Sequence, residues 1–412
     1  MAAPAPSACS ATGPGPGAAA GPPGIDAVRL ACFALLVANL SYMVIVLMSG
    51  DWIVDAAGRP VHTDFVMVYA AGKLALAGDP AAAWDWTAHR AAEDAALGRA
   101  VPAYYGWHYP PPFLMVAAAL ATLPYWAAFV TWMAVTLPLY AAAVRGIVGD
   151  RLGWLVAGGF PVVVPNLVPG QNGFLTASLI GGTLLFLERH PVAAGVCLGL
   201  LTYKPQYGVL FPLVLAVAGR WTVMIAAAGT ALALGAVTWL VFGSAPWAAF
   251  LHWLPLTSDA LLSGTNAEFY KFQSLFALVR VAGGGAGLAW TLQLLLAGAT
   301  ALGLGLMWRS RRVSFDMKAA ALAAGVLLAT PYVYLYDLAI LAVALAFLLR
   351  GALSTGFLLG ERAGLAAIAL AFVVLPVAGV PVGTATTLLA LFLIVRRALV
   401  LASEPAPVAS AA

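Results

Sequence analysis

Long apolar runs separated by short polar turns extend from residue 25 to residue 402 of the chain. A helix needs roughly 20 apolar residues to span the hydrocarbon core of a bilayer. The pattern predicts an all-α polytopic membrane protein with about twelve transmembrane helices, several of them shorter than a full span. The predicted helices lie near residues 27–48, 124–144, 152–167, 172–187, 192–203, 206–218, 221–242, 286–308, 317–330, 333–349, 363–380 and 382–395.

Prolines interrupt the apolar pattern at two places. Pro205 separates 192–203 from 206–218, and because proline cannot continue a helix interior we expect short, broken helices here. Broken helices are tolerated at membrane depth where they line a polar cavity. Three successive prolines precede the apolar run 111–121, which is too short to span a bilayer. We predict a re-entrant or interfacial helix for this run.

Residues 50–110 form a long first loop with a mixed polar and apolar pattern. Within it Phe65, Tyr69, Gly72 and Leu76 recur at helical spacing, which predicts an amphipathic helix beside the membrane. The pattern thus favours a helical loop rather than an unstructured one.

We expect residues 25–402 to form a single transmembrane domain. The preceding 24 residues are rich in Ala, Pro and Gly and carry no charged side chain, a composition typical of a disordered tail. They lack the basic segment of a signal peptide, so the first apolar run is expected to be retained as an anchor. Residues 403–412 are expected to form a short C-terminal tail.

Composition and charge support the membrane assignment and suggest an orientation. Hydrophobic residues make up 63% of the chain and charged residues only 9%, far below the share of about 25% in soluble domains. With the N-terminus inside, thirteen of the twenty Lys and Arg residues fall in cytoplasmic segments, as the positive-inside rule requires. We therefore expect a multi-pass protein of a bacterial-type plasma (inner) membrane, with both termini cytoplasmic.

The polar stretches between the predicted helices are sorted to one side of the membrane. In this topology they all fall on the extracytoplasmic side, whereas the cytoplasmic turns are short and basic. The stretches are HTDFVMVYAAGK, GWHYPPP, VPGQNG, YKPQ, TNAEFYKFQS and TPYVYLYD. Such one-sided clustering favours a functional site in the outer leaflet, which a uniform scaffold protein would not need.

Four blocks of the sequence resemble glycosyltransferase family 87, in the order in which that family carries them. The blocks are TDFVMVYAAGKLALAGDPAAAWD, YPPPFLMVAAALATLPYWAAFVTW, GQNGFLTASLIGGTLLFLERHPVAAGVCLGLLTYKPQ and FQSLFALV. Family members are similar to superfamily C glycosyltransferases. The resemblance implies that a hexose, expected to be mannose, moves with inversion from a polyprenyl-phosphate donor to a lipid or glycan acceptor at the outer face.

Asp64 is the candidate general base. An inverting transfer needs a base that takes the proton of the acceptor hydroxyl as its oxygen attacks the anomeric carbon. From the residues alone, Asp64 is as readily explained as a helix N-terminal cap. The resemblance favours the base, since this acid is the catalytic one in the family.

Lys204 and Lys271 are the candidate ligands of the donor phosphate. Lys204 follows an apolar run and precedes a proline, so we expect it at membrane depth, where an unpaired lysine is costly and a phosphate oxygen would satisfy it. The alternative is a lysine that snorkels to the interface. Lys271 lies in a loop, where a solvated lysine needs no special explanation.

Ten further polar and aromatic residues are candidates for substrate binding, each with a structural alternative such as helix capping, packing or pairing with another side chain. They are Tyr69, Trp107, His108, Tyr109, Gln171, Asn172, Gln206, Gln273, Tyr336 and Asp337. No His, Cys, Asp or Glu spacing typical of a metal site and no Asp-x-Asp motif is present. We expect no cofactor and no nucleic-acid partner, and the sequence specifies neither a metal requirement nor an oligomeric state.

A second hypothesis is a secondary transporter or lipid flippase that uses Asp337 and Lys204 as coupling charges. We find no repeat between the two halves of the chain, and a first loop of this length is unusual for a carrier. A structure distinguishes the hypotheses, because the enzyme requires Asp64 and Lys204 in one cavity and a transporter requires its charges near the bilayer midplane.

Overall fold

The computed structural model describes residues 25–100, 104–262, 268–374 and 381–403. These residues form helices joined by short connections, which confirms the all-α prediction. The α-helices are α1 (Ile25–Met48), α2 (Phe65–Leu76), α3 (Trp86–Leu97), α4 (Pro112–Ala121), α5 (Tyr125–Val148), α6 (Leu152–Gly159), α7 (Val163–Leu167), α8 (Gly173–Phe186), α9 (Pro191–Leu200), α10 (Phe211–Val217), α11 (Trp221–Phe242), α12 (Ala245–Leu262), α13 (Leu275–Val281), α14 (Ala286–Arg309), α15 (Phe315–Leu328), α16 (Ala339–Thr355), α17 (Glu361–Val374) and α18 (Gly383–Ser403). Short 3-10 helices are η1 (Pro80–Ala83), η2 (Leu201–Tyr203), η3 (Pro205–Tyr207), η4 (Phe269–Lys271) and η5 (Leu335–Leu338).

Six helices within the described residues are long and apolar enough to cross a membrane. They are α1, α5, α11, α14, the continuous segment of η5 and α16, and α18. Shorter apolar helices of 10–17 residues correspond to three of the other six predicted runs, 172–187, 192–203 and 206–218, and α4 corresponds to the predicted short run 111–121. The chain is thus a membrane protein, but twelve spans are not confirmed.

The predicted set of helices differs from the structure at three places. The run 152–167 forms two helices, α6 and α7, because the chain turns away from helical geometry at Phe160, just before a proline. The prediction missed α12 altogether, since Pro255 and several polar residues interrupt its apolar pattern. The run 363–380 is helical up to Val374, and its remainder lies outside the described residues, as do the two predicted tails except Ser403.

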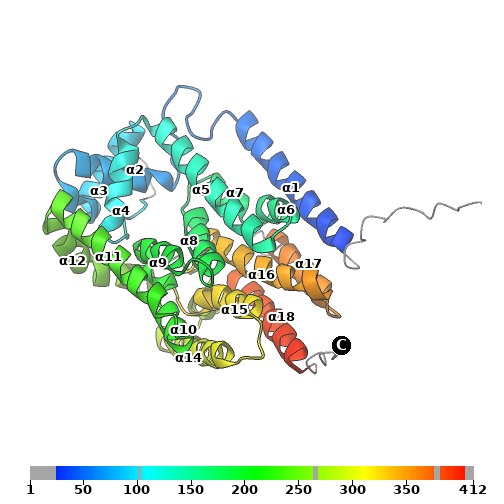
Figure 1. Cartoon of the computed structure of the whole chain (residues 1–412). Helices are drawn as coiled ribbons and strands as arrows, with labels where there is room; N and C mark the ends of the chain where they lie inside the picture. Colours follow the sequence, from blue (N-terminus) through cyan, green and yellow to red (C-terminus); the bar gives the residue numbers. More distant parts are fainter. Residues whose placement is uncertain (1–24, 101–103, 263–267, 375–380, 404–412) are drawn as a thin grey trace, which may run out of the picture.

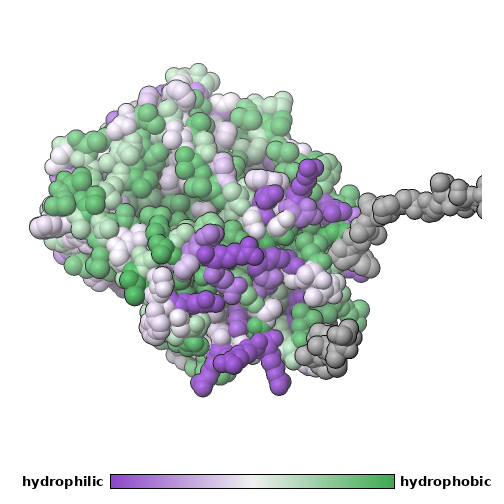
Figure 2. All heavy atoms as spheres, in the orientation of Figure 1, coloured by the Kyte–Doolittle hydropathy of each residue, from purple (hydrophilic) through white to green (hydrophobic). Residues whose placement is uncertain are grey.

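The core lies around α8, α15 and α16, which Figure 1 shows in the middle of the molecule, with α1 along one edge and α12 at the opposite edge. Of the apolar window in Leu335–Thr355, 72% of the residues are buried, whereas none are buried in that of α1. The surface is largely apolar, and Figure 2 shows hydrophilic residues gathered where α14 turns into α15. An apolar surface of this extent is typical of helices that face lipid.

The first loop is a packed part of the fold. The segment carries α2, η1 and α3, and α2 is buried along most of its length against α4. The approach is close at Gly72, where a Cβ atom would lie 2.1 Å from the carbonyl oxygen of Ala117. Asp79 and Asp85 cap η1 and α3 by accepting backbone N–H groups. The predicted helical loop is confirmed, and glycine at position 72 lets α2 pack directly on α4.

We predict that Gly72→Ala lowers the thermal stability of the detergent-solubilised protein. The added methyl group collides with the backbone of α4, and overpacking of this kind costs about 1–3 kcal/mol. The matched control is Gly229→Ala in α11, where a Cβ atom meets nothing within 4 Å. There the substitution is expected to be neutral or stabilising by up to about 1 kcal/mol. Equal melting temperatures for the two variants would contradict the packing of α2 on α4.

Candidate active site

A cavity of about 930 Å³ lies between the first loop, α12 and the connections around η3, η4 and η5. Ten of the thirteen residues predicted for the site line this cavity, although they come from distant parts of the chain. They are Asp64, His108, Tyr109, Gln171, Lys204, Gln206, Lys271, Gln273, Tyr336 and Asp337. Asp64 and Lys204 therefore share one cavity, as the glycosyltransferase hypothesis requires.

Asp64 lies in the cavity wall immediately before α2. Its Oδ2 atom accepts a short hydrogen bond from Nε2 of Gln171, and its side chain does not cap α2, so the capping alternative does not apply. Gln171 is itself held by its backbone N–H, which donates to the Asn166 carbonyl at 2.8 Å. Burial raises the pKa of Asp64 above its ordinary value, against the opposing effects of the Gln171 hydrogen bond and the Lys271 charge. A carboxylate with a raised pKa is a stronger base.

Lys204 and Asp337 form a buried ion pair in the same cavity. The Lys204 Nζ atom lies 2.6 Å from Oδ1 of Asp337, and the two residues are 4% and 1% exposed. The other carboxylate oxygen, Oδ2, accepts the backbone N–H of Tyr334 at 3.1 Å. Lys204 also lies over the Tyr336 ring, 4.7 Å from its centroid. Lys204 therefore neither snorkels nor lacks a protein partner, and the structural pairing of Asp337 with a lysine is the one found.

The proline predicted to break the helix sets the position of Lys204. Pro205 begins η3 directly after η2, and Lys204 connects the two 3-10 helices with a backbone that is not helical. Helix η5 begins at Leu335 with a capping arrangement in which Asp337 accepts the N–H of Tyr334. Two interruptions of regular helix, 133 residues apart in the chain, thus bring the two charges together.

Lys271 and Gln273 belong to a segment beside the cavity that is held by an ion pair and by hydrogen bonds to the start of α18. Lys271 pairs with Glu268 and stays partly exposed. The Gln273 side-chain oxygen accepts the N–H groups of Val382 and Gly383 at 2.8 and 3.0 Å. The amide oxygen of Gln273 is thus used to join this segment to the start of α18, while Lys271 keeps its ammonium group near the cavity.

His108 projects into the cavity from the segment before α4. A Cβ atom at Gly106 would lie 2.4 Å from the His108 ring, so the ring occupies its position because residue 106 is a glycine. The side chain is exposed within the cavity, and desolvation by the surrounding protein lowers the pKa of His108 below its ordinary value. The imidazole is thus neutral near pH 7 and can both donate and accept a hydrogen bond.

Three predicted site residues lie behind the cavity wall rather than in it. Trp107 is 1% exposed and stacks on Phe113, with ring centroids 5.7 Å apart. Asn172 is 2% exposed and donates to the hydroxyl of Tyr109 at 2.6 Å. Tyr69 donates to the carbonyl of Leu123 at 3.0 Å. The structure places these three side chains as supports, and they do not line the cavity.

Sequence reasoning missed the contribution of α12. Phe250, Leu254, Thr257, Ser258 and Leu261 line the cavity and follow the spacing of one helix face. This spacing was the signal available in the sequence. Helix α12 rests on the first loop through two aromatic contacts, Trp253 with Trp86 and Phe250 with Trp84, at centroid distances of 5.0 and 6.3 Å.

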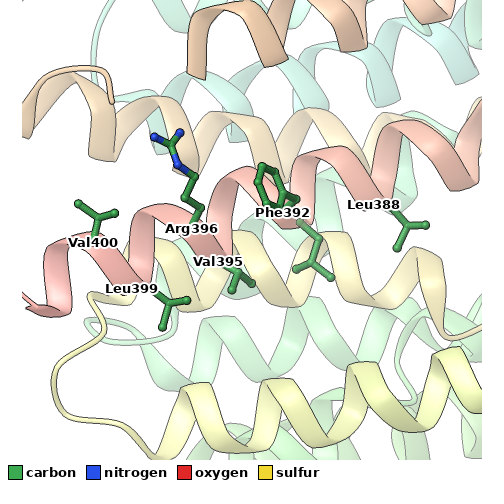
Figure 3. A pocket seen from close by; sticks show the side chains of 7 residues that line it. Leu388, Phe392, Val395, Arg396, Leu399 and Val400 are labelled. Carbon is green, nitrogen blue, oxygen red and sulfur yellow. The ribbon is translucent and has the colours of Figure 1, made fainter. Parts of the chain in front are cut away.

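A second hollow, of about 500 Å³, lies on the surface of α18 (Figure 3). Figure 3 shows Leu388, Phe392, Val395, Leu399 and Val400 around it, with Arg396 on the same helix. The Arg396 guanidinium donates to the carbonyl of Leu359 at 2.6 Å. The hollow shares no residue with the cavity that contains Asp64, and its lining has no second ionisable group. Within the described residues, no group of three or more His, Cys, Asp or Glu side chains is placed to hold a metal ion.

Comparison with known families decides the class of protein. The sequence model of glycosyltransferase family 87 matches residues 107–331, just over half of the 412 residues. The chain belongs to glycosyltransferase family 87. No curated protein and no solved structure matches it. This family 87 protein is accordingly a membrane glycosyltransferase.

The family match covers only part of the cavity. His108, Gln171, Lys204 and Lys271 lie inside the matched region, whereas Asp64, Tyr336 and Asp337 lie outside it. The proximity of Asp64 to the matched residues is therefore a result of the fold. The transporter hypothesis names Lys204 and Asp337 as coupling charges, and the structure places these two side chains together as an ion pair in the cavity.

We predict that Asp337→Asn destabilises the protein by about 3–5 kcal/mol, because it leaves Lys204 buried without a counter-charge. Asparagine can still accept the N–H of Tyr334, so the loss of stability reports the removal of the negative charge alone. The double variant Lys204→Met/Asp337→Asn is expected to recover much of the stability. Thermal unfolding of both single variants and the double variant in one detergent measures the coupling. Strictly additive losses would contradict the ion pair.

Proposed function

We propose that this family 87 enzyme transfers a hexose, with mannose as the expected sugar, from a polyprenyl-phosphate donor to a hydroxyl group of a lipid or glycan acceptor. The transfer inverts the anomeric configuration, and Asp64 is the general base. The observation that supports this most is the presence of a half-buried carboxylate, oriented by Gln171, in the same cavity as the cations Lys204 and Lys271.

In the proposed reaction the acceptor oxygen attacks the anomeric carbon from the face opposite the phosphate. The new bond joins the acceptor oxygen to that carbon, and the bond between the carbon and the phosphate oxygen breaks. The electron pair of the broken bond stays on the polyprenyl phosphate, and the acceptor proton passes to a carboxylate oxygen of Asp64. Because phosphate is already a good leaving group, this transfer does not require a general acid.

Lys204 and Lys271 would stabilise the charge that builds up on the leaving phosphate. A lysine ammonium group has three N–H donors, and Asp337 occupies one of those of Lys204. The remaining donors are available to phosphate oxygens, while Asp337 keeps the ammonium group in place. Lys271, paired with Glu268 at the exposed side of the cavity, would add a second charge-assisted contact.

The polar and aromatic walls of the cavity suit a sugar. Tyr109 and Tyr336 offer ring faces or hydroxyl groups, and Gln206 offers an amide. The neutral imidazole of His108 can bind a sugar hydroxyl as donor or acceptor. Sugars bind through such combinations of apolar faces and fixed hydrogen-bonding groups.

We also propose that the cavity faces the extracytoplasmic side of a plasma (inner) membrane, with both termini in the cytoplasm. The excess of Lys and Arg in the opposite turns supports this orientation. Residues 25–402 would then act as a single domain, in which the first loop supplies the base and the later helices supply the phosphate contacts.

We predict that Asp64→Asn lowers the turnover number at least about a hundredfold, because asparagine keeps the shape of the side chain but cannot accept a proton near neutral pH. The matched control is Asp85→Asn in the same loop, where asparagine caps α3 as well as aspartate does. The control should retain near-normal transfer. Radiolabelled hexose transfer in detergent micelles measures both variants. Near-normal turnover of a folded Asp64→Asn protein would remove Asp64 as the base.

We predict that Lys271→Gln raises the KM for the polyprenyl-phosphate hexose roughly tenfold, since a charge-assisted hydrogen bond contributes about 1.5–3 kcal/mol. Lys73→Gln is the control, because Lys73 lies over the Tyr69 ring outside the cavity and should leave KM unchanged. A panel of polyprenyl-phosphate sugars, with a nucleotide hexose as comparison, identifies the donor. Transfer from the nucleotide hexose alone would contradict the proposed donor class.

A further inference from the structure

A buried polar cluster on α3 lies behind the wall formed by Tyr104, Tyr105 and Gly106. His89 and Glu93 are both 0% exposed, and neither lines the cavity. Three atoms of the cluster, Nδ1 of His89, Oε1 of Glu93 and the hydroxyl of Tyr104, have no hydrogen-bond partner among the described residues. Buried polar atoms without partners are rare, so this cluster needs a physical explanation.

The hydrogen bonds of His89 define its tautomer. Its Nε2 atom lies 3.0 Å from the carbonyl oxygen of Met67. A carbonyl only accepts, so Nε2 carries the hydrogen and Nδ1 of the neutral ring is an acceptor. Oε1 of Glu93 lies 3.9 Å from Nδ1, and Oε2 of Glu93 accepts the backbone N–H of Tyr105 at 3.4 Å.

This arrangement fits a neutral glutamic acid better than a carboxylate. A protonated Oε1 can turn its hydrogen toward the acceptor Nδ1 of His89, 3.9 Å away and thus beyond hydrogen-bond distance, while Oε2 still accepts from Tyr105. An ionised Glu93 would instead face an acceptor nitrogen in a buried site. Burial raises the pKa of Glu93 to about 8 and lowers that of His89 to about 4, so both groups are neutral near pH 7.

The charged and titratable groups around Glu93 do not reverse this conclusion. The groups that interact electrostatically with Glu93 belong to α3 itself, the residue before α2, the wall segment (residues 104–106) and α5. They are His89, Arg90, Asp94, Asp64, Tyr104, Tyr105 and Tyr125. Asp94 and Asp64 raise the pKa of Glu93 further, and Arg90 only partly opposes them.

Tyr105 connects this cluster to the base. Burial is the main cause that raises the pKa of Tyr105 to about 12, and the nearby Asp64 carboxylate raises it further, while the Tyr105 hydroxyl in turn lowers the pKa of Asp64. The Tyr105 ring also packs on His62, with ring centroids 4.7 Å apart. The backbone of Tyr105 is therefore anchored on Glu93, and its side chain reaches Asp64.

We infer that Glu93 is a positioning residue for the transfer reaction: as a neutral acid it lies beside the acceptor nitrogen of His89, accepts the backbone N–H of Tyr105 and so fixes the wall segment that carries the Tyr105 hydroxyl to Asp64. The catalytic part of this inference rests on the proposed function. Loss of the Glu93 proton places an unpaired charge behind the wall and loosens the contact with Asp64. Transfer then falls although neither Glu93 nor His89 touches substrate.

The first test is the pH profile of transfer by the full-length protein in detergent micelles. The wild-type turnover number should fall at least fivefold as the pH rises from 7 to 9.5. Glu93→Gln is always neutral, keeps an oxygen that accepts the backbone N–H of Tyr105 and offers an amide N–H on the side of His89. Its turnover number should therefore fall less than twofold over the same range, with an unchanged KM. The matched control Glu188→Gln removes a half-exposed acid paired with Arg220 and should keep the wild-type fall. The same alkaline fall in Glu93→Gln would overturn the inference.

The second test is independent of activity and uses thermal unfolding. The folded pKa of Glu93 lies above its unfolded value of about 4.5, so its stabilising contribution is complete below about pH 4.5 and is lost as the pH rises toward about 8. The melting temperature of Glu93→Gln should therefore rise relative to that of the wild type between pH 5 and pH 8, and the difference between the two should stay constant at higher pH. If the melting temperatures of the wild type and Glu93→Gln changed with pH in parallel, the inference that Glu93 is a neutral acid would be wrong. If the wild type transferred no sugar from any donor, the proposed function and the catalytic part of the inference would fail, while the unfolding curves would still decide the protonation of Glu93.

Discussion

The ion pair between Lys204 and Asp337 is the constraint on which the cavity depends. Each charge lies where a helix is interrupted, Lys204 between η2 and η3 and Asp337 inside η5. Neither charge is tolerable in an apolar interior without the other, because a buried ion alone costs several kcal/mol. The pair therefore fixes the distance between two distant segments, and the interruptions leave room for a polar cavity among apolar helices.

The cavity walls are held by contacts that residues in and behind them make with neighbouring segments. Asn172 fixes the Tyr109 hydroxyl, Trp107 stacks under Phe113, and Gln273 ties its segment to the start of α18. Such support is what an active site needs, because catalytic geometry is lost when the shell around it is loose. In the proposed enzyme, the reacting groups and the groups that hold them come from separate elements.

Periodicity and composition were sufficient to predict the all-helical membrane class and the break at Pro205, and ten of the thirteen candidate site residues line the cavity because they lie in the polar stretches between apolar runs. They were not sufficient for contacts between distant segments. Nothing near Lys204 in the sequence points to Asp337, and the capping alternative for Asp64 was eliminated only when Gln171 was placed beside it. Helix α12 was missed because Pro255 interrupts its apolar run.

Helix α12 gives the cavity a wall that is a single helix thick. One face lines the cavity, while Leu251 and Leu256 on the same helix are 65% and 44% exposed on the apolar surface. The outer face of this helix is thus apolar and exposed, while its inner face borders the cavity. In the proposed enzyme, one layer of side chains would separate a lipid-linked donor from lipid on this apolar face, so the packing of the membrane around α12 would become part of the environment in which the sugar is transferred.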